Sequence, residues 1–246
     1  MLEPCAVTGD GYNKALPNQM ARAKQLSLEF STRGGVRPGA GRKPAPANVG
    51  LQPHEARKAF KKAVPVHATM RALRGAPAMR RELVVLVVVA EIARASAKGF
   101  RVLHYSVQND HLHVIAEGDD GVSFSRGMQR LASRIAIGIN ALVSRRGQFW
   151  RERYFRTDLK TPRQFRNALV YVTFNFRKHS RGMENRIDLY SSALWFEEWS
   201  VRSEPLEAYR ARAGPSPVVR PKSWVARIGW RKHGRIHPLE APRSAS

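Results

Sequence analysis

Three short stretches of this chain alternate apolar and polar residues with period two, and longer apolar patterns at helical spacing lie between and after them. The alternating stretches cover residues 64–71, 100–108 and 111–117. Period two is typical of strands that bury one face, whereas apolar residues three and four apart indicate helices with one buried side. The pattern therefore predicts a sheet with helices packed on it.

The remaining elements complete the order. Residues 79–98 predict a helix that ends at Gly99, residues 122–145 a second helix and residues 148–159 a further strand. A capping box at residues 161–164, with proline at the first helical position, begins the last helix. The order strand, helix, strand, strand, helix, strand, helix predicts an α+β, ferredoxin-like split βαβ core with one added helix. Its antiparallel sheet carries the two inner helices on one face.

The apolar residues also predict which side of each element is buried. In the 100–108 strand, Leu103, Tyr105 and Val107 should share the buried face. The helix before Arg145 should bury a stripe of six residues. These are Phe124, Met128, Leu131, Ile135, Ile139 and Leu142.

Polar side chains should gather on the opposite face of the sheet. Because Leu112 and Val114 suit the core, His111 and His113 point the other way. His67 and Thr69 should share that face on the first strand. It is therefore expected to lie open to a ligand and to the final helix.

The final helix adds two reactive side chains. Tyr171 and Asn175 lie four residues apart and so on one side of the helix. Imidazoles and an amide oxygen bind divalent metals, and a phenol is a potential nucleophile. Two imidazoles favour Mn²⁺, whereas cellular abundance favours Mg²⁺. The rival tyrosines Tyr105, Tyr154 and Tyr190 have no potential ligand at helical spacing.

The charge of the chain indicates its partner. Lys and Arg number 43 against 19 Asp and Glu, which gives a net charge of +24 and a pI near 11.3. Nucleic acid is the first expectation and an anionic membrane the second. Cys5 is the only cysteine, which excludes a disulfide framework and a cysteine zinc site within one chain. The apolar run 83–90 is too short to span a bilayer, so we expect a soluble protein with no membrane partner.

The chain should divide into three parts. Residues 1–62 form a basic Gly/Pro-rich extension, residues 63–180 the catalytic domain, and residues 181–246 a basic, Trp-containing region. The extension is either a disordered linker or an arm whose arginines enter the minor groove. In the last part Trp195 and Trp199 favour packing on the core, whereas Trp224 and Trp230 fit packing and base stacking equally well. Twelve cations along the chain are the candidates for DNA binding. They are Arg37, Arg42, Lys43, Arg71, Arg126, Arg130, Arg151, Arg153, Arg177, Lys178, Arg231 and Lys232.

The motifs resemble those of a known family. His111-Leu112-His113 with one downstream tyrosine and an asparagine is similar to the HUH endonucleases. The stretches 105–115, 147–154 and 171–175 resemble the REP-associated tyrosine transposases, which are IS200-like bacterial enzymes. The likeness covers residues 64–180. Two departures are Asn109-Asp110 where many relatives have Pro-Asn, and residues 176–178 where many have Pro-Val-Arg.

The resemblance implies a divalent metal, Mg²⁺ or Mn²⁺, and cleavage of single-stranded DNA beside a hairpin. His111, His113 and Asn175 carry over as metal ligands and Tyr171 as the nucleophile that stays joined to the 5′ phosphate. One tyrosine per site favours a monomer, and the expected location is the bacterial cytoplasm, with the nucleoid. The alternative is a domesticated protein that binds DNA or RNA hairpins without cleaving them.

Overall fold

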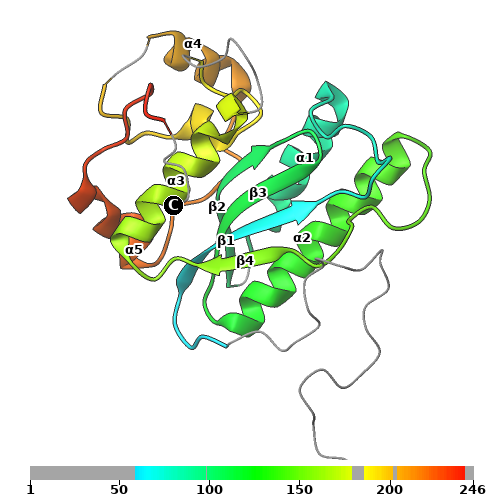
Figure 1. Ribbon diagram of the computed structural model, residues 1–246, viewed down its shortest axis with the longest axis horizontal. Coiled ribbons are helices and arrows are strands. Elements are labelled where there is room, and N and C mark those ends of the chain that lie inside the picture. The colour runs from blue at the N-terminus through cyan, green and yellow to red at the C-terminus, as the bar shows by residue number, and fades with distance from the viewer. Residues whose placement is uncertain (1–58, 98, 179–185, 202–203, 242–246) are drawn as a thin grey trace, which may run out of the picture. The chain divides into compact units, whose positions relative to one another are not determined.

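Four strands form one antiparallel sheet in the computed structural model, which describes residues 59–97, 99–178, 186–201 and 204–241. Their order across the sheet is β2-β3-β1-β4 (Figure 1). The strands are β1 (Val64–Arg71), β2 (Phe100–Val107), β3 (His111–Gly118) and β4 (Phe155–Asp158). Each neighbouring pair is antiparallel, as in a ferredoxin-like sheet. The predicted α+β fold is confirmed.

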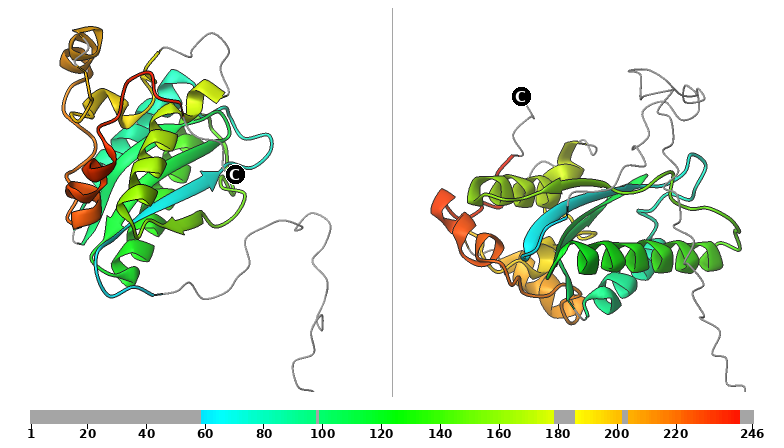
Figure 2. Two further views of the ribbon diagram at one scale, coloured as in Figure 1. Left: turned by 60° about the vertical axis from the view of Figure 1, so that its left-hand side comes forward. Right: turned by 90° about the horizontal axis from the view of Figure 1, so that it is seen from below.

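Helices cover both faces of the sheet. α1 (Glu82–Ala95) and α2 (Gly121–Leu142) lie on one face, and α3 (Pro162–Phe174) lies on the other (Figure 2). The core beneath α1 and α2 joins apolar residues of three strands to both helices. Among its members are Val66, Ala68, Met70, Leu112, Val114, Val88, Ile92, Leu131 and Ile135. Gly127 of α2 lies directly over the Phe100 ring, where a Cβ atom would collide with the ring.

One prediction about the buried faces is wrong because β2 contains an irregularity. Its register against β3 shifts between Val102 and His104. A bulge places an extra residue on one strand and reverses the faces beyond it. Leu103 consequently packs in the cluster on the α3 side, whereas Tyr105 and Val107 pack toward α1 and α2.

The ends of several elements also differ from the prediction. α1 and β4 are shorter than expected, and α2 ends at Leu142, whose side chain is exposed instead of buried. The start of α3 is as predicted: Thr161 accepts a hydrogen bond from the backbone of Gln164, and the Gln164 side chain accepts one from Thr161. This capping box and Pro162 fix where the helix begins.

A further layer covers part of the sheet face that the sequence left open. Residues 186–241 include η3 (Ser192–Trp195), α4 (Glu204–Ala213), α5 (Trp224–Arg227) and η4 (Gly229–His233). Many of them pack with α3 in a second apolar cluster, in which Trp199 and Trp230 are buried. The packing role expected for Trp199 is confirmed, and the half-buried Trp195 packs on both clusters. Trp224 is exposed.

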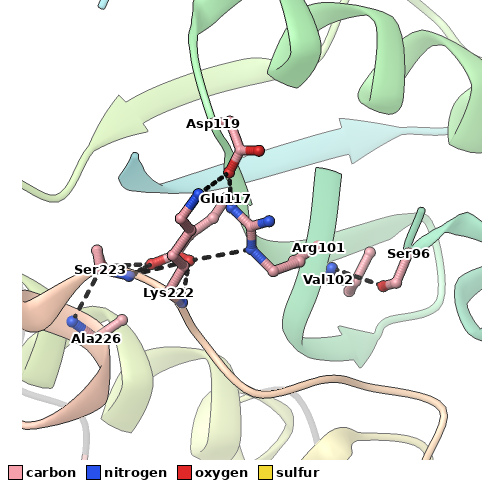
Figure 3. Close-up of polar contacts among 8 residues, drawn as sticks. All are labelled: Ser96, Arg101, Val102, Glu117, Asp119, Lys222, Ser223 and Ala226. Atoms are coloured by element: carbon pink, nitrogen blue, oxygen red, sulfur yellow. Dashed lines mark hydrogen bonds and ion pairs between the residues drawn. The ribbon is translucent and has the colours of Figure 1, made fainter. Parts of the chain in front are cut away.

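A buried carboxylate anchors this C-terminal layer to the sheet (Figure 3). Glu117 of β3 is fully buried and accepts hydrogen bonds from the backbone N–H groups of Lys222 and Ser223 and from the Ser223 hydroxyl. Arg101 of β2 lies beside it, with Nε 3.6 Å from a carboxylate oxygen. Ser223 in turn caps α5, so Glu117 fixes the start of the segment that packs on α3.

The boundaries of the three predicted parts stay predictions. Phe60, inside the expected extension, accepts a backbone hydrogen bond from Gly121 and its ring lies 6.0 Å from that of Phe124. In the part of the chain that the structure describes, no helix is both long and apolar enough to cross a membrane.

Candidate functional site

The two histidines of β3 form the centre of the site. His111 pairs with Arg71 and His113 with Thr69 across the β1–β3 ladder, and both imidazoles lie on the α3 side of the sheet, as predicted. Both residues are buried. Their Nε2 atoms are 3.0 Å apart, and the rings are nearly perpendicular. Two ring nitrogens on one strand therefore face a common point.

A carboxylate orients the first imidazole. The Nδ1 atom of His111 lies 2.6 Å from Oδ1 of Asp110. Burial raises the pKa of Asp110, but the hydrogen bond with His111 and the nearby charge of Arg71 outweigh it and hold that pKa below its usual value. An ionised carboxylate only accepts hydrogen bonds, so Nδ1 of His111 carries the proton.

Two groups on β1 face the second imidazole. The Nδ1 atom of His113 lies 3.0 Å from Oγ1 of Thr69 and 3.1 Å from Nε2 of His67. Burial lowers the pKa of His67 to about 4, so this ring is neutral near pH 7. A hydroxyl oxygen and a neutral imidazole nitrogen can both accept a hydrogen bond from Nδ1–H.

These partners decide where the lone pairs of His111 and His113 point. With acceptors at both Nδ1 atoms, we infer that each neutral ring keeps its proton there. The two Nε2 lone pairs then converge across 3.0 Å. Converging lone pairs repel each other unless a cation or a proton lies between them, so the arrangement favours a bound cation.

The final helix brings the remaining two side chains to this point. Asn175 follows the last residue of α3, and its Nδ2 atom lies 3.1 Å from Nε2 of His113. The Tyr171 ring contacts the His113 ring edge-on with centroids 5.2 Å apart, and it also contacts His67. Burial raises the pKa of Tyr171. Of its rivals, Tyr105 is fully buried in the core.

The donor set fits a divalent metal. Asn175 is almost fully buried, and its Oδ1 atom has no hydrogen-bond partner among the described residues. A buried amide oxygen without a partner is costly, and a cation would satisfy it. Among the described residues, no three His, Cys, Asp or Glu side chains form a metal-binding group. The Asn175 amide, which lies beside His113, is therefore the third protein ligand that we assign to a metal at His111 and His113.

The candidate DNA-binding cations do not share one surface. Arg71 lies beside the site, half exposed and 3.6 Å from Asp110. Arg126, Arg130 and Arg153 are exposed, but Arg126 and Arg153 line a cavity of about 890 Å³ on the α2 side of the sheet. Arg151 is exposed where its backbone N–H meets the end of β1.

The other candidates have internal partners or lie outside the description. Arg177 donates to the backbone carbonyls of Arg186 and Pro238 and lies 4.1 Å from the centre of the Phe174 ring, so its guanidinium holds the C-terminal segment. Arg231 pairs with Glu198, and Lys232 lies over the Trp224 ring. The Lys178 side chain and the residues Arg37, Arg42 and Lys43 lie outside the described part. The role of all twelve cations in DNA binding stays a prediction.

Sequence reasoning gave no role to three residues that touch the imidazoles. His67 and Thr69 were expected on the correct face, and their alternation with His113 on facing strands was the signal available. Asp110 was interpreted only as part of a turn. Its position directly before a candidate ligand histidine is the sequence feature that indicates a role in orienting that imidazole.

Comparison with known proteins supports the resemblance. Residues 78–173 match the family described as "Transposase IS200 like", a segment that contains His111, His113 and Tyr171. None of the curated proteins matches the chain. A solved structure described as "Structure of the REP associates tyrosine transposase bound to a REP hairpin" is 14% identical, with a TM-score of 0.45 over 58% of this chain and 83% of that one. The family match thus confirms the resemblance to IS200-like transposases over residues 78–173.

Proposed function

We propose that this chain, which matches the IS200-like transposases over residues 78–173, is a metal-dependent strand transferase for single-stranded DNA. It would cleave beside a hairpin and rejoin strands through a 5′-phosphotyrosine. The supporting observation is that the Nε2 atoms of His111 and His113, the Asn175 amide and the Tyr171 ring meet within one chain. One protomer supplies every group that a single cut requires.

Three side chains would hold Mg²⁺ or Mn²⁺. These are His111 and His113 through Nε2 and Asn175 through Oδ1, the atom that has no partner among the described residues. When bound, the ion would polarise the scissile phosphate and offset its growing negative charge. Asp110 and Thr69 hold the two imidazoles at their other nitrogens, so the lone pairs stay aimed at the site.

Tyr171 would carry out the covalent step. Its Oη atom attacks phosphorus and loses its proton, while the bond from phosphorus to the 3′ oxygen breaks. The 3′ oxygen takes up a proton and leaves as a hydroxyl, and the 5′ phosphate stays joined to Tyr171. Attack by the 3′ hydroxyl of another strand reverses these changes and frees the tyrosine. The energy of the phosphodiester is retained throughout, which suits exchange of strands instead of degradation.

The test is formation of a covalent adduct. The full chain is incubated with end-labelled DNA hairpins that carry single-stranded tails, in Mn²⁺ or Mg²⁺, and resolved on a denaturing gel. We expect an adduct that disappears in EDTA and in Tyr171→Phe but persists in the control Tyr190→Phe. Binding without any adduct, across a broad set of hairpins, would instead support a protein that binds hairpins and has lost cleavage.

A further inference from the structure

An exposed aromatic side chain lies at the edge of the sheet beside the site. Phe155 is the first residue of β4, the outermost strand next to β1 (Figure 1), and 51% of it is exposed. The exposed part of this apolar side chain makes no contribution to the core. Core packing therefore does not account for an aromatic residue at this position, and a ligand on this face of the sheet could.

The register places the Phe155 ring on the face that carries the site. Phe155 is paired with Thr69, and Thr69 is paired with His113. Paired residues on neighbouring strands point to the same side of a sheet. The next residue, Arg156, points the other way, over the rings of Phe60 and Phe124 in the α2 layer. Phe155 thus lies in line with the imidazole, on the side of the sheet that α3 covers.

Exposed cations lie on the neighbouring strand and at both ends of β4. Arg71 follows Thr69 at period two, so its side chain shares the face and is 53% exposed. Arg151 and Lys160, on either side of β4 in the chain, are exposed as well. An exposed aromatic ring on a strand edge, with exposed cations further along the same strands, can take unpaired nucleotides, because bases stack on the ring while phosphates meet the cations.

The distance between Phe155 and His113 suits a DNA strand whose scissile phosphate lies at the site. Two strand spacings separate Phe155 from His113, or about 10 Å. Stacked nucleotides rise about 3.4 Å each along one strand, so about three nucleotides bridge this gap. Bases inside a duplex are stacked on each other and cannot use the ring, so the occupant must be unpaired.

We propose that Phe155 stacks on an unpaired base a few nucleotides from the phosphate that Tyr171 attacks. This subsite rests on the proposed function for the position of the strand. It selects single-stranded over duplex DNA at the cut and fixes the direction in which the strand leaves the site. The base would be chosen by stacking, not by hydrogen bonds to its edge.

Binding measured without cleavage tests the subsite. With labelled oligo(dT) in EDTA, Phe155→Leu should weaken binding about 10-fold, whereas Phe155→Trp should bind at least as well as the wild type, since one stacked base contributes that much. Leu86→Ala is the matched control, because Leu86 is an exposed apolar residue too but lies on α1, across the sheet. Thermal unfolding of each variant verifies that the fold is retained.

Photocrosslinking gives an independent measurement of position. Oligo(dT) in which thymidine is replaced by 5-iododeoxyuridine should crosslink to the peptide that contains Phe155, and Phe155→Leu should remove that crosslink. Equal binding by wild type and Phe155→Leu, equal loss in Phe155→Leu and Phe155→Trp, or crosslinks confined to other peptides would each overturn the subsite. Neither measurement needs cleavage. A missing adduct would therefore reject the proposed reaction, while binding and crosslinking would still test the Phe155 subsite.

Discussion

Replacing Glu117 with glutamine should destabilise the protein strongly, although the two side chains have nearly the same size and shape. The carboxylate is fully buried and accepts hydrogen bonds from two backbone N–H groups and the Ser223 hydroxyl, and Nε of Arg101 lies 3.6 Å from it. Glutamine keeps one oxygen but turns an NH₂ group toward the remaining donors. The Ser223 hydroxyl can rotate to accept from it, whereas a backbone N–H cannot.

The cost follows from this inventory. One backbone N–H is left without an acceptor, and Arg101 loses its buried carboxylate neighbour but keeps its ion pair with Asp119. Hydrogen bonds to a charged group contribute about 1.5–3 kcal/mol each. We therefore expect the free energy of unfolding to fall by about 3 kcal/mol in Glu117→Gln.

Urea unfolding followed by circular dichroism measures the loss. The matched control is Asp119→Asn, because Asp119 also pairs with Arg101 and Lys222 but is 40% exposed, and exposed ion pairs contribute little. The midpoint should move much further for Glu117→Gln than for the control, and residues 219–241 should become the first site of proteolysis. Equal, small shifts in both variants would show that Glu117 does not anchor the layer.

Three other perturbations test the site and its surroundings. Asp110→Asn should lower Mn²⁺ affinity about 10- to 100-fold in calorimetry, because it weakens the hold on His111; unchanged affinity would remove Asp110 from the site. His104 has its pKa lowered by burial from 6.5 to about 4, so its contribution to stability is complete above pH 6.5 and is lost as the pH falls toward 4. At pH 5 the loss of unfolding free energy is at most about 2 kcal/mol. In His104→Leu the dependence of stability on pH should be smaller but still present, because His67 titrates in the same range. Identical stability–pH profiles for the wild type and the variant would contradict this. Arg71→Ala should lower the slope of log K against log salt by about 0.7 if the side chain contacts one phosphate of single-stranded DNA, and an unaltered slope would place Arg71 outside the interface.

Periodicity predicted three of the strands because each buries one face, and the order of the elements predicted the antiparallel sheet. It failed at Leu103, where a bulge in β2 shifts the period by one residue. The alternation of apolar and polar residues in the sequence does not reveal where a bulge will occur. It also missed the layer that covers α3. The tryptophans of residues 186–241 indicated packing, but which sheet face they would cover depends on a long-range contact, the one between Glu117 and Ser223.

The candidate site was predictable where local spacing decides direction. His111 and His113 on a strand, and Tyr171 and Asn175 on a helix, each share a face because of their spacing. That the two pairs meet depends on α3 lying over β3, which the element order indicated. The partners of the imidazoles were not predictable in the same way, since Thr69 and His67 reach His113 only through the register between β1 and β3.

Tyr171 lies on the last turn of α3 and Asn175 directly follows that helix, which has a consequence for any change that moves α3. A ligand of the proposed metal and the proposed nucleophile would shift together relative to the imidazoles, which are fixed in the sheet. Metal affinity and adduct formation should therefore decline in parallel when the contacts of α3 are loosened, instead of separately. The C-terminal layer provides such contacts, because η4 and α5 pack on α3 and Glu117 anchors them. A folded Glu117→Gln protein that binds Mn²⁺ normally would show that the imidazoles and Asn175 hold their positions without this layer.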